Sequence, residues 1–311
     1  SSQAAPQTPQ QQPQNRSSLS AVERAKADPR FLTQWIKNTR GAYDIIKLHA
    51  KHSTSFNAIH LSATWMALSR HLNTRARASE SRSGYTRYRP IPPALEDGLK
   101  PLMRQSAEMA LAGALGGREL ANVMYGIARS RIPEWKARSA LLDVLAVSAA
   151  TRLRDLKPQE LSNSAWAYAT AGHDSPKLFD GIAEVATERA LDFNPQELSN
   201  VAWAFATAEH KAPELFDAIA DAAQTNVDEF NPQNLANLAW AFAKSGHTAP
   251  RLLDVLAAAA TANCEQFNEQ NLANIAWAYS TAGHAAPELY NALTATVAQR
   301  IGELKPQELA N

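Results

Sequence analysis

Cysteine is almost absent from this 311-residue sequence, in which Cys264 is the single example. One thiol excludes an internal disulfide framework and a zinc site built on cysteines, so we expect an intracellular protein. Glycine is also sparse, at 12 residues, whereas 45% of the residues are hydrophobic. Much of that fraction is alanine and leucine, which favours close-packed helices over sheets. No apolar run approaches the roughly 20 residues that cross a bilayer, so we expect no membrane segment.

Negative charge is scarce in the first half of the chain, and positive charge is scarce in the second. Residues 1–155 hold 23 Lys and Arg against 11 Asp and Glu, a balance of +12. Residues 156–311 hold 8 against 19, a balance of −11, and the net charge of +1 conceals this asymmetry. A basic half is the expected contact surface for an anionic partner, so the two halves should make different contacts.

The chain carries one dominant pattern, which repeats every 37 residues. Its full units span 157–193, 194–230, 231–267 and 268–304, and residues 305–311 open a fifth. Because of that last partial unit and the missing initiator methionine, we expect a fragment of a longer protein. A period of this length predicts stacked helical hairpins, an all-α solenoid. The repeated text is LSNSAWAYA at 161–169, LSNVAWAFA at 198–206, LANLAWAFA at 235–243 and LANIAWAYS at 272–280.

Each unit is expected to form two helices. In the second unit the first helix begins at Asn194-Pro195, where Asn caps free N–H groups and Pro occupies the first helical position. The second helices begin at Pro176, Pro213, Pro250 and Pro287. First helices should end at glycines in the left-handed conformation, with a weaker cap where the second unit has Glu209. Those glycines are Gly172, Gly246 and Gly283.

Upstream the repeat is degenerate. Residues 120–128 (LANVMYGIA) match 161–169 with Tyr125 in the tryptophan position, and residues 59–68, with Trp65, match more loosely. We predict basic, degenerate repeats over 29–155, led by a helical cap at 29–50, and regular repeats over 156–311. Within the basic part, residues 73–98 lack apolar periodicity and are predicted to be a loop or linker. The Gln/Pro/Ser-rich segment 1–28 is predicted to be a disordered tail, with the remnant of an organellar transit segment as the alternative.

The sequence offers little for catalysis, so we expect neither an enzyme nor a cofactor. Four histidines recur at one position of the repeat, namely His173, His210, His247 and His284. Equivalent residues of stacked hairpins lie about one helix diameter apart, roughly 10 Å, so these side chains are too far apart to share a metal ion. We expect polar turn residues there.

Polar side chains on the first helices are better candidates, and for binding. In each unit a Gln, an Asn and a Thr or Lys are separated by 4 and 7 residues and share a helix face. Amides of this kind suit the edges of RNA bases, although the Asn could instead hydrogen-bond the backbone of a neighbouring helix. The candidate RNA-binding residues are Gln159, Asn163, Thr170; Gln196, Asn200, Thr207; Gln233, Asn237, Lys244; and Gln270, Asn274, Thr281.

Three further features bear on binding. The positions that differ between units are the expected specificity determinants; they are Glu160/Glu197/Asn234/Asn271 and Thr170/Thr207/Lys244/Thr281. The repeated tryptophans are expected to be apolar core, with a stacking surface as the alternative. The basic insertion interleaves arginines with Tyr85 and Tyr88 and either binds phosphates and unpaired bases or is a solvated linker. Its candidate RNA-binding residues are Arg75, Arg77, Arg82, Arg87 and Arg89.

The stretch 194–208 (NPQELSNVAWAFATA), followed by 212–217 (APELFD), resembles the repeats of octotricopeptide and heptatricopeptide proteins. It is also similar to the repeats of FAST-kinase-like proteins and of kinetoplastid RNA-editing substrate-binding subunits. The resemblance is close over 157–311 and weaker over 56–156. It implies an α-solenoid that binds organellar RNA and governs its stability, processing, editing or translation, in many cases with a C-terminal RAP domain. Two features depart from these families: the array is acidic, and its units are nearly identical.

We therefore predict an RNA-binding repeat protein of the mitochondrion or chloroplast, with the cytoplasm as the alternative location. Single-stranded RNA and other proteins of an RNA-processing complex are the expected partners. The competing hypothesis is a protein-interaction scaffold whose acidic array binds a basic protein segment. Charge placement discriminates between them. Cations on the same face as the asparagines favour RNA, whereas an acidic face favours the scaffold.

Overall fold

The computed structural model describes residues 29–83, 91–133 and 136–303, and every regular element in these ranges is a helix. The predicted all-α solenoid is confirmed. The α-helices are α2 (Pro29–Lys37), α3 (Ala42–His52), α4 (Ala58–Ser83), α5 (Pro93–Leu111), α6 (Gly117–Arg129), α7 (Lys136–Ala150), α8 (Pro158–Ala171), α9 (Pro176–Glu188), α10 (Pro195–Thr207), α11 (Pro213–Thr225), α12 (Pro232–Ser245), α13 (Pro250–Ala262), α14 (Glu269–Ala282) and α15 (Pro287–Glu303).

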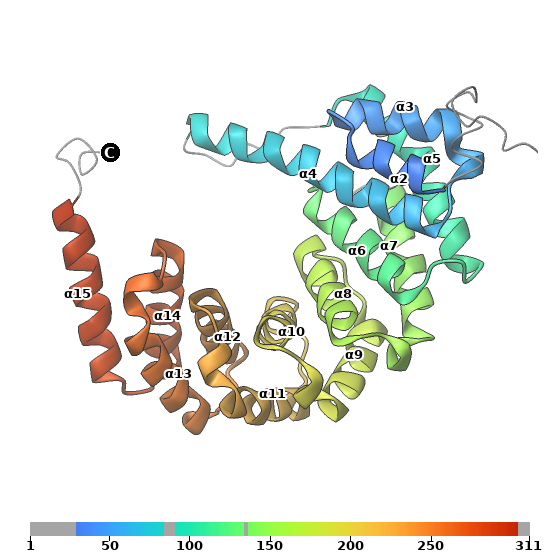
Figure 1. The fold of residues 1–311 in the computed structure, drawn as a ribbon. Coiled ribbons are helices and arrows are strands. Elements are labelled where there is room, and N and C mark those ends of the chain that lie inside the picture. The colour runs from blue at the N-terminus through green and yellow to red at the C-terminus, as the bar shows by residue number, and fades with distance from the viewer. Residues whose placement is uncertain (1–28, 84–90, 134–135, 304–311) are drawn as a thin grey trace, which may run out of the picture.

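The helices form two layers that follow an arc (Figure 1). Even-numbered helices from α4 to α14 pack side by side in chain order along the inner layer. Odd-numbered helices from α3 to α15 pack in the same way along the outer layer. The first helices α8, α10 and α12 therefore have a neighbour on both sides and the outer layer behind them, which leaves one face open toward the inside of the arc, and α14 has α12 as its one inner neighbour among the described helices.

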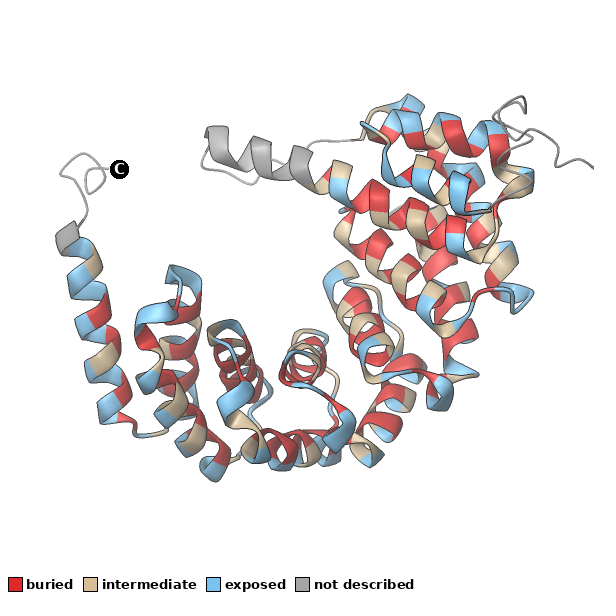
Figure 2. Cartoon of the chain, in the orientation of Figure 1, coloured by how far each residue is buried: buried red, intermediate tan, exposed pale blue. Residues whose placement is uncertain are grey.

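Alanine explains how closely the inner helices approach. Ala165, Ala202 and Ala239 are fully buried where first helices meet, and each is followed two positions later by another buried alanine. The outer helices contribute larger core side chains, such as Phe179 and Phe216. Because small residues allow closer packing on the inner side than on the outer side, the stack of hairpins curves. Figure 2 shows the buried residues concentrated where helices face one another.

The helix ends follow the sequence prediction. At the start of α10, Asn194 Oδ1 accepts a hydrogen bond from the Glu197 amide at 2.9 Å, and Glu197 Oε2 accepts one from the Asn194 amide at 3.0 Å. This reciprocal pair is a capping box. Gly172, with φ of 62°, ends α8 in the left-handed conformation, and Gly246 and Gly283 do the same for α12 and α14. Glu209 adopts a φ of 53° at the corresponding position, which costs about 1–2 kcal/mol for a residue with a side chain.

The repeated histidines join consecutive units. His210 Nε2 lies 2.8 Å from Asp180 Oδ1, and His247 and His284 make the same contact with Asp217 and Asp254 at the same distance. His173 pairs in this way with Asp143. The prediction of polar turn residues was therefore incomplete, because each imidazole reaches back to the outer helix of the preceding hairpin. The aspartates also recur every 37 residues, 30 positions before each histidine, and this signal was visible in the sequence.

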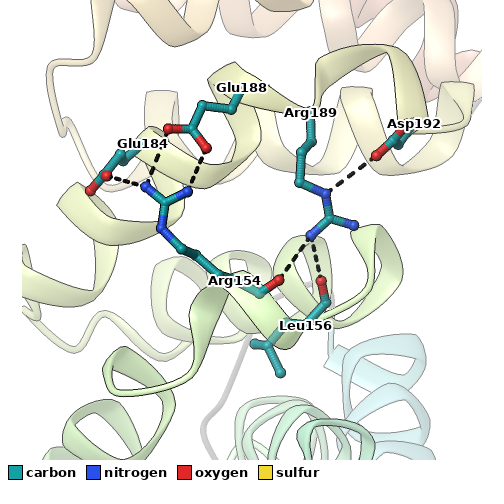
Figure 3. Close-up of polar contacts among 6 residues, drawn as sticks. All are labelled: Arg154, Leu156, Glu184, Glu188, Arg189 and Asp192. Atoms are coloured by element: carbon teal, nitrogen blue, oxygen red, sulfur yellow. Dashed lines mark hydrogen bonds and ion pairs between the residues drawn. The ribbon is translucent and has the colours of Figure 1, made fainter.

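An arginine at the end of an outer helix ties each of three units to the one before it. Arg189 Nη1 donates to the Leu156 carbonyl at 2.8 Å and also approaches the Arg154 carbonyl, while its Nε faces Asp192 (Figure 3). In the same view Arg154 bridges Glu184 and Glu188, and this contact lowers the pKa of Glu188. The equivalent residues Arg152 and Arg300 donate to the carbonyls of Leu115 and Phe267.

Two units lack this arginine and have Asn226 and Asn263 in its place. Asn226 Oδ1 is buried without a hydrogen-bond partner, and Asn263 makes only local contacts, in which its Nδ2 donates to the Ala259 carbonyl and its Oδ1 accepts from Gln266 Nε2. We expect Asn226→Arg and Asn263→Arg to bind the carbonyls of Phe193 and Phe230 and to raise the free energy of unfolding by about 0.5–1.5 kcal/mol each. Urea unfolding measures this change. The matched Asn→Lys variants add charge without a planar donor fork, so equal stabilisation by lysine would contradict the explanation.

Part of the basic insertion does not match its predicted structure. Residues 73–83 continue α4 and residues 93–98 begin α5, so most of the predicted loop at 73–98 is helical. Pro93 at the start of α5 begins a helix instead of ending one, which is the position where a missing N–H has no consequence. Residues 29–50, predicted to be a helical cap, form α2 and most of α3. The predicted tail at 1–28 lies outside the described residues. Among the described helices none is long and apolar enough for a transmembrane span.

Candidate nucleic-acid interface

The open face of each first helix carries one stripe of four side chains, separated by 4, 3 and 4 residues. In α10 the stripe consists of Gln196, Asn200, Trp203 and Thr207, whereas the positions between them are mostly buried. We call these side chains, together with their equivalents in the other units, the inner-face stripe. The equivalents are Gln159, Asn163, Trp166 and Thr170 in α8; Gln233, Asn237, Trp240 and Lys244 in α12; and Gln270, Asn274, Trp277 and Thr281 in α14.

The structure therefore brings the twelve candidate residues of the first helices onto one surface. The glutamines are exposed and the asparagines are partly exposed. In the described part of the chain, the side chains of Asn163, Asn200, Asn237 and Asn274 make no hydrogen bond to another residue. The alternative that these asparagines tie neighbouring helices together is thus not supported. Their amides remain available, with a donor and an acceptor side by side.

The tryptophans lie at the border of the core, because Trp166, Trp203 and Trp240 pack against it while remaining partly exposed, so the expectation of apolar core holds only for one side of each ring. Trp203 lies three residues after Asn200 and four before Thr207, so helical geometry places it on the polar face. Tyr168, Phe205, Phe242 and Tyr279 fill the core two positions later. Trp166, Trp203 and Trp240 are partly exposed, and the side chain of Trp277 is more open, at 43%.

The rings instead form a ladder along the arc. The centroids of Trp166 and Trp203 lie 6.4 Å apart with 30° between the ring planes, and the next two steps are 6.4 Å and 6.0 Å with nearly the same tilt. Tyr125 extends the ladder at its N-terminal end, 4.9 Å from Trp166. A continuous row of aromatic rings bordered by amides suits stacking and edge recognition of unpaired bases.

Most positions that vary between units have structural partners. Glu160 and Glu197 accept hydrogen bonds from the backbone at the starts of their own helices. Asn234 and Asn271 are buried at this position, and Asn234 Nδ2 donates to Ser199 Oγ. At the last stripe position, Lys244 Nζ pairs with Glu209 Oε1 at 3.0 Å. The position held by Glu160, Glu197, Asn234 and Asn271 therefore caps or packs its own helix. Its variation between units alone suggested that it determines specificity.

Helix α6 continues the stripe with two cations that the repeat pattern did not predict as binding residues. Its four residues are Arg118, Asn122, Tyr125 and Arg129, in the same spacing. Arg129 Nη1 donates to the Tyr125 hydroxyl at 2.9 Å, and its guanidinium lies 5.7 Å from the ring centroid. The sequence similarity of residues 120–128 to the later units could have identified Asn122 and Tyr125. The two arginines occupy positions held by Gln and Thr in later units.

Helix α4 departs further from the pattern. Met66 occupies the ring position of the stripe, whereas Trp65 is fully buried and its indole donates to Ser106 Oγ at 3.0 Å. The loose match that centred on Trp65 was therefore one residue out of register. Arg75, Arg77 and Arg82 lie in the last turns of α4, where the structure does not describe the side chains, and Arg87 and Arg89 lie outside the described residues.

Acidic side chains are excluded from the stripe but not from the inner helices. None of the stripe side chains from α6 to α14 is acidic. Half of the described acidic residues of the array lie on the outer helices, where Glu184, Asp221 and Asp254 are exposed, and most of the others lie in the connections between helices. Glu160, Glu197 and Glu269 lie in the first turns of α8, α10 and α14. The stripe is thus neutral over α8, α10 and α14 and basic at α6. Over the residues described, no group of His, Cys, Asp and Glu is arranged to hold a metal ion.

Residues 97–309 match the family model of the RNA-editing substrate-binding complex 6 protein. This match covers more than half of the chain and includes every repeat from α6 to α14. No curated protein matches the chain significantly. The chain belongs to the RNA-editing substrate-binding complex 6 protein family.

Proposed function

We propose that this member of the RNA-editing substrate-binding complex 6 family binds single-stranded RNA along the inner-face stripe and acts without catalysis in an RNA-processing complex. One observation carries the proposal. The unpartnered asparagines, the aromatic ladder and the α6 arginines share one face that contains no acidic stripe residue. Bases contact the rings and amides, while Arg118 and Arg129 bind phosphate at the N-terminal end.

The proposals for the organelle and for the step of RNA metabolism rest on the repeat sequence. Its resemblance to octotricopeptide and heptatricopeptide repeats supports a role in the stability, processing, editing or translation of organellar transcripts, in a mitochondrion or chloroplast. The name of the matched family supports RNA editing in particular, with other proteins of the complex as partners. The basic segment that contains Arg75, Arg77, Arg82, Arg87 and Arg89 supplies additional phosphate contacts.

Fluorescence anisotropy of a labelled random RNA pool, with matched DNA as the comparison, tests the proposal. We expect binding that weakens steeply between about 50 and about 200 mM salt, because each phosphate contact releases counterions. Exchanging Arg118 and Arg129 for glutamine should weaken binding and reduce the salt slope by about 2. The control is Arg104→Gln, which removes an exposed cation from the outer helix α5. An equal loss with the control would show that the inner face is not the contact surface.

The exposed carboxylates of the outer helices favour a second candidate, a scaffold that binds a basic protein segment. They lie on the surface away from the stripe, so this contact does not compete with RNA for the same residues. If no RNA binds at low salt while an arginine-rich peptide does, and outer-layer variants such as Glu184→Gln weaken the peptide, the scaffold function replaces the RNA function.

A further inference from the structure

We infer that the inner-face stripe recognises a run of one base, with one nucleotide for each repeat unit; this inference rests on the proposed RNA-binding function. Its starting point is the uniformity of the array. In four successive units the first three stripe positions are occupied by Gln, Asn and Trp without exception. An array that recognises a mixed sequence with one base per unit needs different side chains at these positions.

The positions that do vary cannot supply that difference. Glu160 and Glu197 are hydrogen-bonded to the backbone at their own helix starts, and Asn234 and Asn271 are buried beneath the stripe. At the fourth stripe position Lys244 replaces the threonine of the other three units, but its ammonium group pairs with Glu209. The side chains left to contact a ligand are therefore the identical ones.

The spacing of the units fits one nucleotide each. Neighbouring indole centroids are 6.0–6.4 Å apart, a distance that a single extended sugar–phosphate unit spans. Within each unit the asparagine lies one helical turn from the tryptophan on the same face. A base that packs against the indole therefore presents its edge toward the amide, which offers one acceptor and one donor group.

Repetition of this arrangement determines the ligand class. Every asparagine amide offers the same donor and acceptor to its base, so a base that satisfies one unit satisfies the next. A mixed sequence leaves amides unmatched in most units. Helix α6 closes the array, because it keeps Asn122 and an aromatic ring while its two arginines bind phosphate. The expected ligand is a homopolymeric run of about four or five nucleotides in single-stranded RNA.

The test compares labelled RNAs of about 12 nucleotides. They are oligo(U), oligo(A), oligo(C) and a mixed sequence without repeated bases, each titrated with the full chain in an anisotropy assay. We expect one homopolymer to bind at least about tenfold more tightly than the mixed sequence. The double variant Asn200→Ala/Asn237→Ala should reduce that homopolymer to the affinity of the mixed sequence and change the mixed sequence little.

Two controls separate recognition from folding. Asn291→Ala removes an exposed asparagine from the outer helix α15 and should leave every affinity unchanged. The thermal unfolding midpoint of the double variant should stay near that of the parent, because neither asparagine makes a hydrogen bond to another described residue. Equal affinity for all four RNAs, or tightest binding of the mixed sequence, overturns the inference and leaves the proposed function intact. Absence of binding to every RNA at low salt overturns both.

Discussion

Replacing Trp203 and Trp240 together with alanine is expected to weaken the binding of single-stranded RNA by at least about thirtyfold. Each aromatic ring that stacks on a base contributes about 1–3 kcal/mol, and the two rings occupy the middle of the ladder. Their neighbours Trp166 and Trp277 would then be separated by a gap, so stacking along the RNA would also be interrupted. Anisotropy titrations of the parent and the double variant at one salt concentration measure the loss.

Phenylalanine provides the matched control for this change. Trp203→Phe/Trp240→Phe keeps two rings on the same face and should retain most of the affinity, because stacking needs an aromatic face and not the indole N–H. The tryptophans also pack against the core, so the alanine variant should lose stability, and circular dichroism at the titration temperature must show that it is folded. RNA affinity that is unchanged in the alanine variant would place the bases elsewhere.

A large stability effect is expected from Gly126→Val, which should lower the free energy of unfolding by about 3 kcal/mol. A β-carbon on Gly126 would lie 2.8 Å from the carbonyl carbon of Trp65 and 2.9 Å from its oxygen. Backbone atoms cannot rotate away, so α4 and α6 would have to separate along their buried contact. Chemical denaturation followed by circular dichroism measures the change.

Gly181→Ala is the control for the conformational effect of replacing a helical glycine. A β-carbon there would meet only Cδ1 of Leu153, the far end of a side chain that can rotate away. Alanine also favours the helix by about 0.5–1 kcal/mol relative to glycine, so this variant should cost far less than Gly126→Val. Similar losses at both positions would mean that the close approach to Trp65 is not the cause.

The sequence by itself determined the architecture. A 37-residue period, Asn-Pro helix starts and glycine helix ends fix where each helix begins and stops, because capping depends on residues within a few positions of one another. The period also placed Asn163, Asn200, Asn237 and Asn274 on one helix face. It did not decide whether that face points toward the outer layer, a neighbouring hairpin or solvent.

Only the tertiary structure decided which face is open. Once a first helix such as α10 has two lateral neighbours and the outer layer behind it, Trp203 and its equivalents must share the remaining face with the asparagines. Packing across units also paired His210 with Asp180 and left Arg118 and Arg129 in line with the neutral stripes. These contacts join residues about 30 or more positions apart, and their geometry depends on how tightly the alanines let the inner helices approach. Local sequence rules contain no information about that distance.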